Sequence, residues 1–442
     1  MTSKAALTYI FTLLVAPVLT QADQRANAPE SLTGRWVVTT DLYGTPIYVS
    51  MDIEQRQGKI VGTYGDEKLE GSINGNLFHF ISRGKSGSTE AEGRVSNGAL
   101  SGTIIDNDDG DKDHPLHYSF TATPVPKYTA GMPLRHEFVP TVFYRQYSAS
   151  TRPVLIVAPG DTIHTTTVDS GGTDEKGETR VLGGNPQTGP FYIESAMPGD
   201  TLVVHLTRLR LNREYALSGD GLVSRALDKG LAQRMKEGGN TVRWNLDLTH
   251  GVASLDQPGP HTSHYKIPVH PMLGCLATAP APMNAAPPTG DSGRYGGNMD
   301  FNEIVEGATV YLPVSVPGAL LYLGDGHAVQ GDGELNGDAL ETSMDVEFTV
   351  DVIPGRITSA PRVESSTHIM AMGLAGSLDE AFRNATSNMA QWLSEDYDLS
   401  PAETAEVLGS AAEYKVSEVA DRNAGIVLKI NKERLKALAT AK

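Results

Sequence analysis

The stretch Gly71-Ser-Ile-Asn-Gly-Asn-Leu-Phe-His-Phe80 alternates apolar and polar residues and has glycine where a strand must bend or turn. Two further stretches have the same character, Gly58-Lys-Ile-Val-Gly-Thr-Tyr64 and Asn97-Gly-Ala-Leu-Ser-Gly-Thr-Ile-Ile105. Short alternating runs separated by glycine turns are typical of antiparallel hairpins. Residues 31–124 are therefore predicted to form an N-terminal β-domain, an antiparallel β-meander or small barrel of about six to eight strands.

The composition supports a β-rich chain and excludes several classes of function. Of 442 residues, 46 are glycine and 26 are proline, which favours short strands and turns over a long helical array. The net charge of −17 argues against nucleic acid as a partner, because phosphate binding needs a basic surface. The single cysteine, Cys275, excludes a disulfide framework and a cysteine-based zinc site. We interpret it as a small buried residue.

Residues 1–22 have the pattern of an export signal. Lys4 precedes an apolar run of about 15 residues that contains Pro17, and small residues follow up to Ala22. The run is too short to span a membrane comfortably. We therefore expect an exported protein, periplasmic or secreted, without stable membrane insertion. Whether the signal is cleaved or retained as an anchor is left open.

A second β-rich region, residues 134–442, follows a proline-rich linker at 123–133. Up to residue 361, short strands alternate with Gly/Pro turns. The sequence Pro-Gly-Asp at 159–161 and 198–200 is typical of type II turns in a sandwich. The stretch 279–297 is rich in Pro, Ala and Gly without periodicity, so we predict a long loop of the kind that often serves as a functional lid.

The C-terminal part is predicted to be helical before a last strand at 425–430. Two capping boxes, Ser377-Leu-Asp-Glu380 and Ser400-Pro-Ala-Glu403, predict helices at about 378–395 and 401–413. One face of the first helix carries apolar residues at helical spacing, namely Ala381, Ala385, Met389 and Trp392. The predicted fold class is α+β and β-dominated: the N-terminal meander or barrel, then a β-sandwich-like domain with a C-terminal helical hairpin.

The densest polar segment is Gly324-Asp-Gly-His-Ala-Val-Gln-Gly-Asp-Gly-Glu334. Its glycines allow a tight fold, so that Asp325, His327 and Asp332 can converge on one cation. One imidazole with several carboxylates suits zinc, manganese or calcium. A solvated acidic turn is the alternative, and the spacing alone does not separate the two interpretations.

Other candidate sites are weaker. The acidic turn 106–113 does not fit the EF-hand pattern and is interpreted as a hairpin tip. Four histidines between 250 and 270 have irregular spacing among prolines, which favours a variable loop over a metal site. No Gly-x-Ser-x-Gly elbow and no Walker loop is present in the sequence.

Several segments resemble the acetamidase/formamidase family, in the family's order over about residues 150–430. These segments are 189–200, 296–300, 311–319, 323–334 and the stretches between 377 and 421. The resemblance implies a largely β fold that hydrolyses a small amide, formamide- or acetamide-like, to a carboxylate and ammonia. It also implies a divalent metal ion, with zinc favoured over calcium or manganese.

The resemblance also implies roles for single residues. The implied metal ligands are Asp169, Asp325 and His327, with Asn298 and Asp300 close by. Asp332 is added to the same site from the spacing of the glycine-rich segment. The implied acid/base and catalytic residues are Glu194, Glu341 and Asp300.

Two features depart from the family, which is generally cytoplasmic and lacks both the export signal and the N-terminal β-domain. The physiological substrate is therefore left open. The sequence also leaves open whether the protein forms a homo-oligomer. The alternatives are an exported solute-binding module on the same fold, or a hydrolase of another C–N or ester bond.

Overall fold

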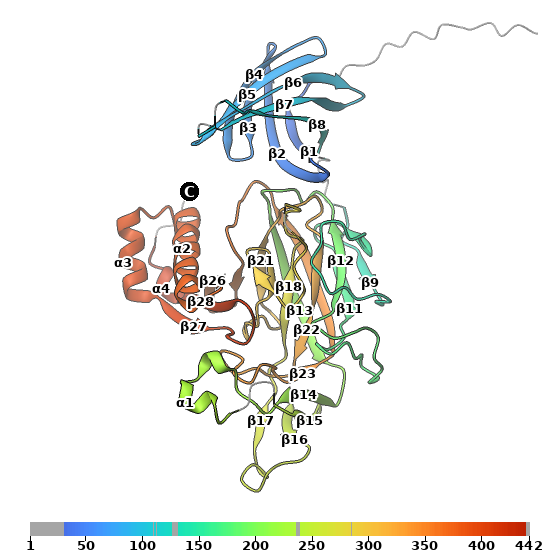
Figure 1. Ribbon diagram of the computed structural model, residues 1–442, viewed down its shortest axis with the longest axis vertical. Coiled ribbons are helices and arrows are strands. Elements are labelled where there is room, and N and C mark those ends of the chain that lie inside the picture. Colours follow the sequence, from blue (N-terminus) through green and yellow to red (C-terminus); the bar gives the residue numbers. More distant parts are fainter. Residues whose placement is uncertain are drawn as a thin grey trace, which may run out of the picture.

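The computed structural model describes residues 31–438 except 109, 112, 126–130, 236–238 and 284. The predicted signal at 1–22 and part of the predicted linker lie outside the described residues. The N-terminal unit is a closed antiparallel barrel, in which β1 pairs with both β2 and β8 (Figure 1). Its strands are β1 (Gly34–Leu42), β2 (Thr45–Arg56), β3 (Lys59–Tyr64), β4 (Glu67–Asn74), β5 (Leu77–Arg83), β6 (Gly87–Ser96), β7 (Ala99–Asp108) and β8 (Leu116–Pro124).

Apolar side chains fill the inside of this barrel. Phe78 and Phe80, which alternate with His79 along β5, are both buried in the barrel core together with Trp36 and Met51. The alternation in the sequence therefore has the expected cause, since successive side chains of a strand point to opposite faces. The predicted N-terminal antiparallel barrel is confirmed. The acidic turn joins β7 to β8 as a hairpin, with positions 109 and 112 outside the described residues.

The large unit is built from two β-sheets (Figure 1). The first has the order β17 (Lys266–Pro268), β16 (Val252–Leu255), β15 (Thr241–Asp247), β14 (Tyr215–Gly219), β23 (Glu341–Thr342), β22 (Leu321–His327), β18 (Met272–Ala277), β20 (Gly296–Asn298) and β19 (Ser292–Gly293). Two more strands belong to it, β12 (Gln187–Ile193), which pairs with β22, and β10 (Leu155–Val157). The second sheet has the order β27 (Glu413–Val416), β28 (Ala424–Asn431), β26 (His368–Ala375), β25 (Arg362–Glu364), β21 (Thr309–Pro313), β13 (Thr201–Leu211), β24 (Met344–Ile353), β11 (Thr162–Thr166) and β9 (Arg135–Glu137).

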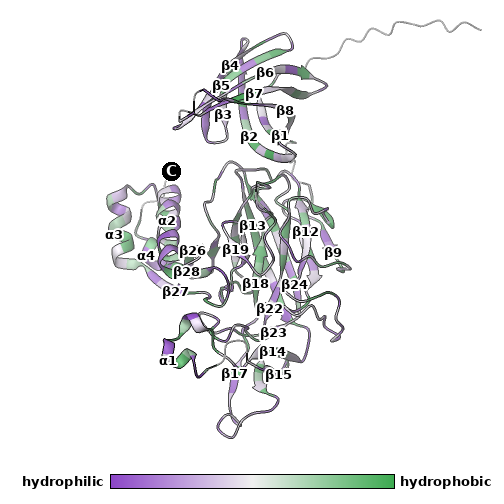
Figure 2. Ribbon diagram, viewed as in Figure 1, coloured by the Kyte–Doolittle hydropathy of each residue, from purple (hydrophilic) through white to green (hydrophobic). Residues whose placement is uncertain are grey.

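The main core lies between these sheets. Leu202 and Val204 of β13 pack in one buried cluster with Leu321 and Leu323 of β22. Figure 2 shows the hydrophobic residues of β13 in green within this layer. Both Pro-Gly-Asp segments are turns with a glycine at positive φ, 90° at Gly160 and 87° at Gly199, as a type II turn requires. The β-sandwich-like arrangement is therefore confirmed.

The helices are η1 (Ser224–Ala226), α1 (Lys229–Ala232), α2 (Leu378–Tyr397), α3 (Pro401–Ala411) and α4 (Lys432–Leu435). The predicted apolar face of α2 is buried against β26 and β28. Ser400 forms a complete capping box with Glu403, whereas at Ser377 only the serine half is formed. The second helix ends at Ala411, two residues earlier than predicted, because Glu413 already begins β27. Within the described part of the chain, every helix is too short or too polar to cross a bilayer.

The predicted loop 279–297 is less irregular than expected. Its last residues form the hairpin of β19 and β20, which places Asn298 at the end of a paired strand beside β18. Backbone pairing therefore holds this end of the segment against the sheet, and position 284 lies outside the described residues.

Candidate active site

The candidate site lies where β22 ends, next to the two-residue strand β23. His327 is the last residue of β22 and pairs in register with Glu341 of β23, so these side chains are neighbours. Asp325 lies two residues before His327 on the same strand. All three are buried: His327 is 0%, Asp325 2% and Glu341 6% exposed.

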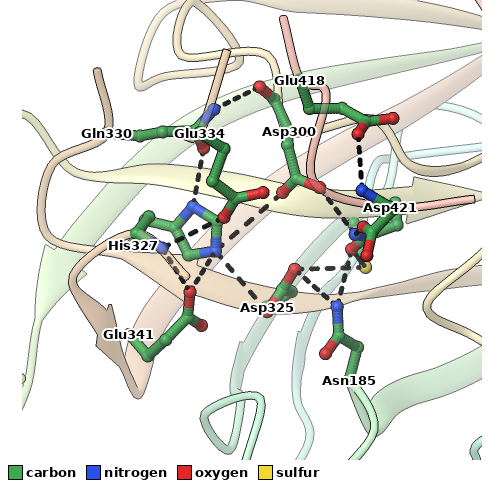
Figure 3. Close-up of polar contacts among 12 residues, drawn as sticks. Asn185, Asp300, Asp325, His327, Gln330, Glu334, Glu341, Glu418 and Asp421 are labelled. Carbon is green, nitrogen blue, oxygen red and sulfur yellow. Dashed lines mark hydrogen bonds and ion pairs between the residues drawn. The ribbon is translucent and has the colours of Figure 1, made fainter. Parts of the chain in front are cut away.

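Strained backbone gathers around this strand end. The angle φ is 59° at Asp325, 41° at Asp300, 48° at Glu334 and 52° at Asn185. Positive φ is costly for residues with a Cβ and persists only where the surrounding structure enforces it. The side chains of all four residues surround the same space (Figure 3). Such clustered strain is characteristic of functional sites.

Three carboxylates face one nitrogen of the imidazole ring. His327 Nε2 lies 3.2 Å from Glu341 Oε1, 3.6 Å from Asp325 Oδ1 and 4.0 Å from Asp300 Oδ1. These contacts come from three separate elements, since Asp300 follows β20. The fold therefore brings residues far apart in the sequence to one point.

Gln330 determines which nitrogen of His327 carries the proton. The amide nitrogen of Gln330 donates to the backbone carbonyls of Asp300 at 2.6 Å and Ser417 at 3.1 Å. Its oxygen, 2.9 Å from His327 Nδ1, is therefore the acceptor, and Nδ1 is the donor. In the neutral ring, Nε2 then presents a lone pair to the carboxylates. That arrangement is stable only with a proton or a metal cation between them.

Burial and the neighbouring carboxylates shift the pKa values of this cluster. Burial is the main cause that raises the pKa values of the Asp300 and Glu334 carboxyls well above their usual range. Burial also raises the pKa of Glu341 to about 7 and that of Asp421 to about 6. For His327, burial lowers the pKa, but the neighbouring carboxylates outweigh it and hold the pKa well above its usual value. Such a site favours an added cation.

Four buried atoms at this point have no hydrogen-bond partner: Asp300 Oδ1, Asp325 Oδ1, His327 Nε2 and Glu341 Oε2. Unpartnered buried polar atoms are rare and need an explanation. Two overlapping groups bring candidate ligand atoms within 4.8 Å of one another, Asp300–His327–Glu334 and Asp325–His327–Glu341. Imidazole and carboxylate are ligands of zinc and related divalent ions, so these acidic and histidine groups fit a metal ion.

Gly274 of β18 leaves room for the two aspartates. A Cβ at this position would lie 2.4 Å from Asp300 Oδ1 and 2.6 Å from Asp325 Oδ2. Contacts that short do not occur, so any side chain at position 274 would displace the carboxylates.

Asn298 orients the carboxylates. Its amide nitrogen donates to Asp300 Oδ2 at 2.6 Å and to Asp421 Oδ2, and its oxygen accepts from Asn185 Nδ2 at 2.8 Å. The same Asn185 nitrogen donates to Asp325 Oδ2 at 3.1 Å. Each aspartate therefore has its Oδ2 atom occupied by an amide, while its Oδ1 atom remains free to face the imidazole.

The structure brings five of the predicted site residues together, namely Asn298, Asp300, Asp325, His327 and Glu341. Three others lie elsewhere. Asp169 is buried in a 2.7 Å ion pair with Arg213 and belongs to neither group of candidate ligands. Glu194 is exposed. It follows the C-terminal end of β12, whereas the other end of that strand, at Gln187, pairs with Gly324 of β22. Asp332 is exposed, because its side chain turns outward to Lys415 at 3.2 Å.

Several residues of the site were given no role from the sequence. Gln330 and Glu334 lie in the glycine-rich segment, which was a usable signal. Asn185 lies in the turn before β12, to which no role was assigned. Asp421 reaches the site from the loop between β27 and β28. It ends a stretch that resembles the family, but it was given no role, since its contact with Asn298 spans 123 residues.

Cys275 and the histidines between 250 and 270 were not predicted to belong to the site. Cys275 is buried as expected, but its Sγ lies 2.7 Å from Asn298 Oδ1 and so borders the site. Burial raises the pKa of this thiol well above its usual value. The histidines between 250 and 270 are exposed, and none of them joins a candidate metal group among the described residues.

Comparison with known proteins shows that this chain is similar to members of one family. A model of the acetamidase/formamidase family matches residues 283–422. The formamidase of Methylophilus methylotrophus is 28% identical over 193 residues, which cover 34% of this chain and 46% of that protein. The chain thus spans about half the length of the curated relatives it matches.

Two solved structures are similar over most of the large unit. A predicted acetamidase/formamidase from Thermoanaerobacter tengcongensis is 28% identical with a TM-score of 0.59, covering 69% of this chain and 98% of its own. An acetamidase from Bacillus halodurans is 28% identical with a TM-score of 0.58, covering 68% of this chain and 99% of its own.

Proposed function

We propose that the large unit of this chain belongs to the acetamidase/formamidase family and hydrolyses a small amide to a carboxylate and ammonia. The substrate class is formamide- or acetamide-like. The observation that carries the proposal is the convergence of unpartnered atoms from Asp300, Asp325, His327 and Glu341 in one buried, strained site.

The donor set supports a divalent metal ion in this reaction. Asp325, His327 and Glu341 would hold it, and zinc is the ion we favour because an imidazole is among the ligands. When bound, such an ion supplies Lewis-acid polarisation of the amide carbonyl and an acidified water.

Two carboxyl groups are suited to move protons during hydrolysis. Glu341 faces His327 Nε2 with its Oε1, and its second oxygen, Oε2, has no hydrogen-bond partner, so that oxygen is suited to accept a proton from the attacking water. Asp300 has a pKa raised well above its usual range and an unpartnered Oδ1 near the imidazole. Its protonated form can donate to the departing amide nitrogen, which is a poor leaving group without that proton.

The direct test is ammonia release from formamide, acetamide and larger amides, before and after treatment with a chelator and after addition of Zn²⁺. We expect His327→Ala to lower kcat by about 10² to 10⁴ and to lose bound zinc. His250→Ala is the matched control, because His250 also pairs with a carboxylate, Asp247, but on the surface.

Each outcome separates the alternatives. Full ammonia release by His327→Ala without bound metal would contradict the mechanism. Hydrolysis of esters but of no amide would indicate another hydrolase. Tight solute binding without turnover would indicate a binding module.

Export to the periplasm or medium is also proposed, because residues 1–22 have the pattern of a signal. Fractionation of cells that express the full chain, with N-terminal sequencing of the product, tests this. A full-length product in the cytoplasm would contradict it.

A further inference from the structure

The ion pair between Asp169 and Arg213 is buried and lies outside both candidate ligand groups. Asp169 is 2% and Arg213 4% exposed, and Arg213 Nη2 lies 2.7 Å from Asp169 Oδ2. Burial of two charges is costly, and further hydrogen bonds are needed to offset it. The remaining contacts of each partner therefore indicate what the pair does.

Arg213 connects to the strand that carries Glu341. Its Nη2 donates to the backbone carbonyl of Glu341 at 3.4 Å, and its Nε donates to the carbonyl of Tyr215 at 3.2 Å. That Tyr215 carbonyl also accepts from the Thr342 hydroxyl at 3.0 Å, so Arg213 links β14 and β23 at one point. The guanidinium lies 4.0 Å from the centre of the Tyr215 ring, which fixes its plane.

Asp169 connects to the turn that carries Asn185. Asp169 Oδ1 accepts from the backbone N–H of Thr173 at 2.8 Å, which closes a tight turn. The next residue, Ser170, accepts at its carbonyl from the backbone N–H groups of Gly184 at 3.0 Å and Asn185 at 3.2 Å. Asn185 in turn donates to Asp325 at 3.1 Å. The Asp169 turn is therefore two contacts away from a candidate metal ligand.

We propose that Asp169 and Arg213 form a positioning clamp, which sets the separation of the Glu341 and Asp325 carboxylates that face His327 Nε2. Arg213 holds the backbone of Glu341, and Asp169 holds the turn from which Asn185 reaches Asp325. Neither residue touches the reacting atoms, so both are positioning residues. The inference rests on the proposed function of the same site, and it assigns to Asp169 a different task from the ligand role that the family resemblance implied.

The test compares Asp169→Asn with the matched control Asp174→Asn. Asp174 lies in the same loop, is 3% exposed, pairs with Arg180 at 3.1 Å and accepts two backbone N–H groups. Its side chain pairs with Arg180 instead of Arg213. Its backbone carbonyl accepts from Arg213 Nη1 at 3.3 Å, and Asp174→Asn leaves that carbonyl in place. Both substitutions remove one buried carboxylate from an ion pair. The Arg180 side chain is 38% exposed and that of Arg213 only 2%, so Asp169→Asn should cost more stability, and the clamp is identified by the effect on kcat relative to KM and by displaced side chains.

We expect Asp169→Asn to lower kcat about 10- to 100-fold with KM changed less than about threefold, and Asp174→Asn to leave kcat within about twofold. Arg213→Lys keeps the charge opposite Asp169 but lacks the planar fork, so kcat should fall in the same way. This second variant decides the matter if Asp169→Asn does not fold. Wild-type kcat in either variant, or an equal loss in Asp174→Asn, would overturn the clamp.

Crystal structures of Asp169→Asn and Asp174→Asn give a measurement that does not depend on hydrolysis. The side chains of Glu341 and Asn185 should be displaced in the first variant and unchanged in the second. Unchanged positions in both would overturn the clamp. A wild-type protein that releases no ammonia would contradict the proposed function, while the displacement would still decide the clamp.

Discussion

Gly274 is the residue at which one added methyl group tests the site most directly. Its hydrogen faces Asp300 Oδ1 and Asp325 Oδ2, which a Cβ would meet at 2.4 and 2.6 Å. We expect Gly274→Ala to weaken Zn²⁺ binding roughly tenfold or more, because overpacking costs about 1–3 kcal/mol and falls on the ligands. Titration calorimetry with Zn²⁺ measures this. Gly331→Ala, in the glycine-rich segment 324–334 and with open space around its Cβ, should bind as the wild type does. Equal affinities in both variants would contradict the arrangement.

At the residue scale, the sequence predicted those site residues that a local motif carries and missed those that long-range contacts place. Asp325 and His327 lie two positions apart on one strand, so their partnership was visible. Asp421 was not assigned, because only the packing of a distant loop brings it to Asn298. Glu194 and Glu341 were equal candidates until strand pairing placed Glu341 opposite His327. Positive φ at Asp300 and Asp325 has no signature in the sequence, because neither is a glycine.

At the element scale, the two long helices α2 and α3 were predicted well, because capping and 3.6-residue spacing are local signals, whereas the short η1, α1 and α4 were not predicted. Ala381, Ala385 and Met389 are all fully buried against the sheet, as their spacing predicted. The order of strands was not predictable, because it depends on contacts between distant segments. The strand β23, which positions Glu341, has only two residues and is too short for any alternation to appear.

The N-terminus of α3 offers a test of this local reasoning. Ser400 accepts from the backbone N–H of Glu403, and Glu403 returns a hydrogen bond to the N–H of Ser400 at 2.8 Å. Ser400→Ala should cost about 1 kcal/mol of helix stability, seen as faster amide hydrogen exchange across 401–411. Ser410→Ala is the control, since Ser410 lies in the last turn of the same helix and bonds only to carbonyls of that helix. If the two variants exchange alike, the cap does not stabilise the helix.

At the scale of the whole molecule, the N-terminal barrel and the large unit meet away from the candidate site. Arg35 of β1 forms a 2.5 Å ion pair with the buried Asp200, which also accepts the backbone N–H of Gly355 at 2.7 Å. Figure 1 shows the barrel beyond one end of the sandwich, with β23 toward the other end. The alternation of apolar and polar residues alone predicted the barrel. Its attachment to the large unit was not predictable, because the buried partner of Arg35 is a single turn residue, Asp200. The barrel contributes no residue to either candidate ligand group.

The stability of the metal-free protein should fall as pH rises between about 5.5 and 8. Burial raises the pKa of Asp421 to about 6, Glu341 to about 7 and Glu418 to about 8. These carboxyls titrate near pH 4 in an unfolded chain, so the folded state holds more protons in this window. Their contribution is complete below about pH 4 and is lost through the raised values, with a slope of up to about 1.4 kcal/mol per pH unit for each group. The net charge of −17 at pH 7 acts in the same direction, so a single-residue comparison is needed.

Thermal unfolding after chelator treatment should give a higher midpoint at about pH 5.5 than at about pH 8, and added Zn²⁺ should reduce the difference because a cation replaces the protons. Glu418→Gln should flatten the pH dependence, whereas Glu433→Gln, at an exposed position, should not. A midpoint that rises with pH in the metal-free protein would contradict the raised pKa values of these carboxyls.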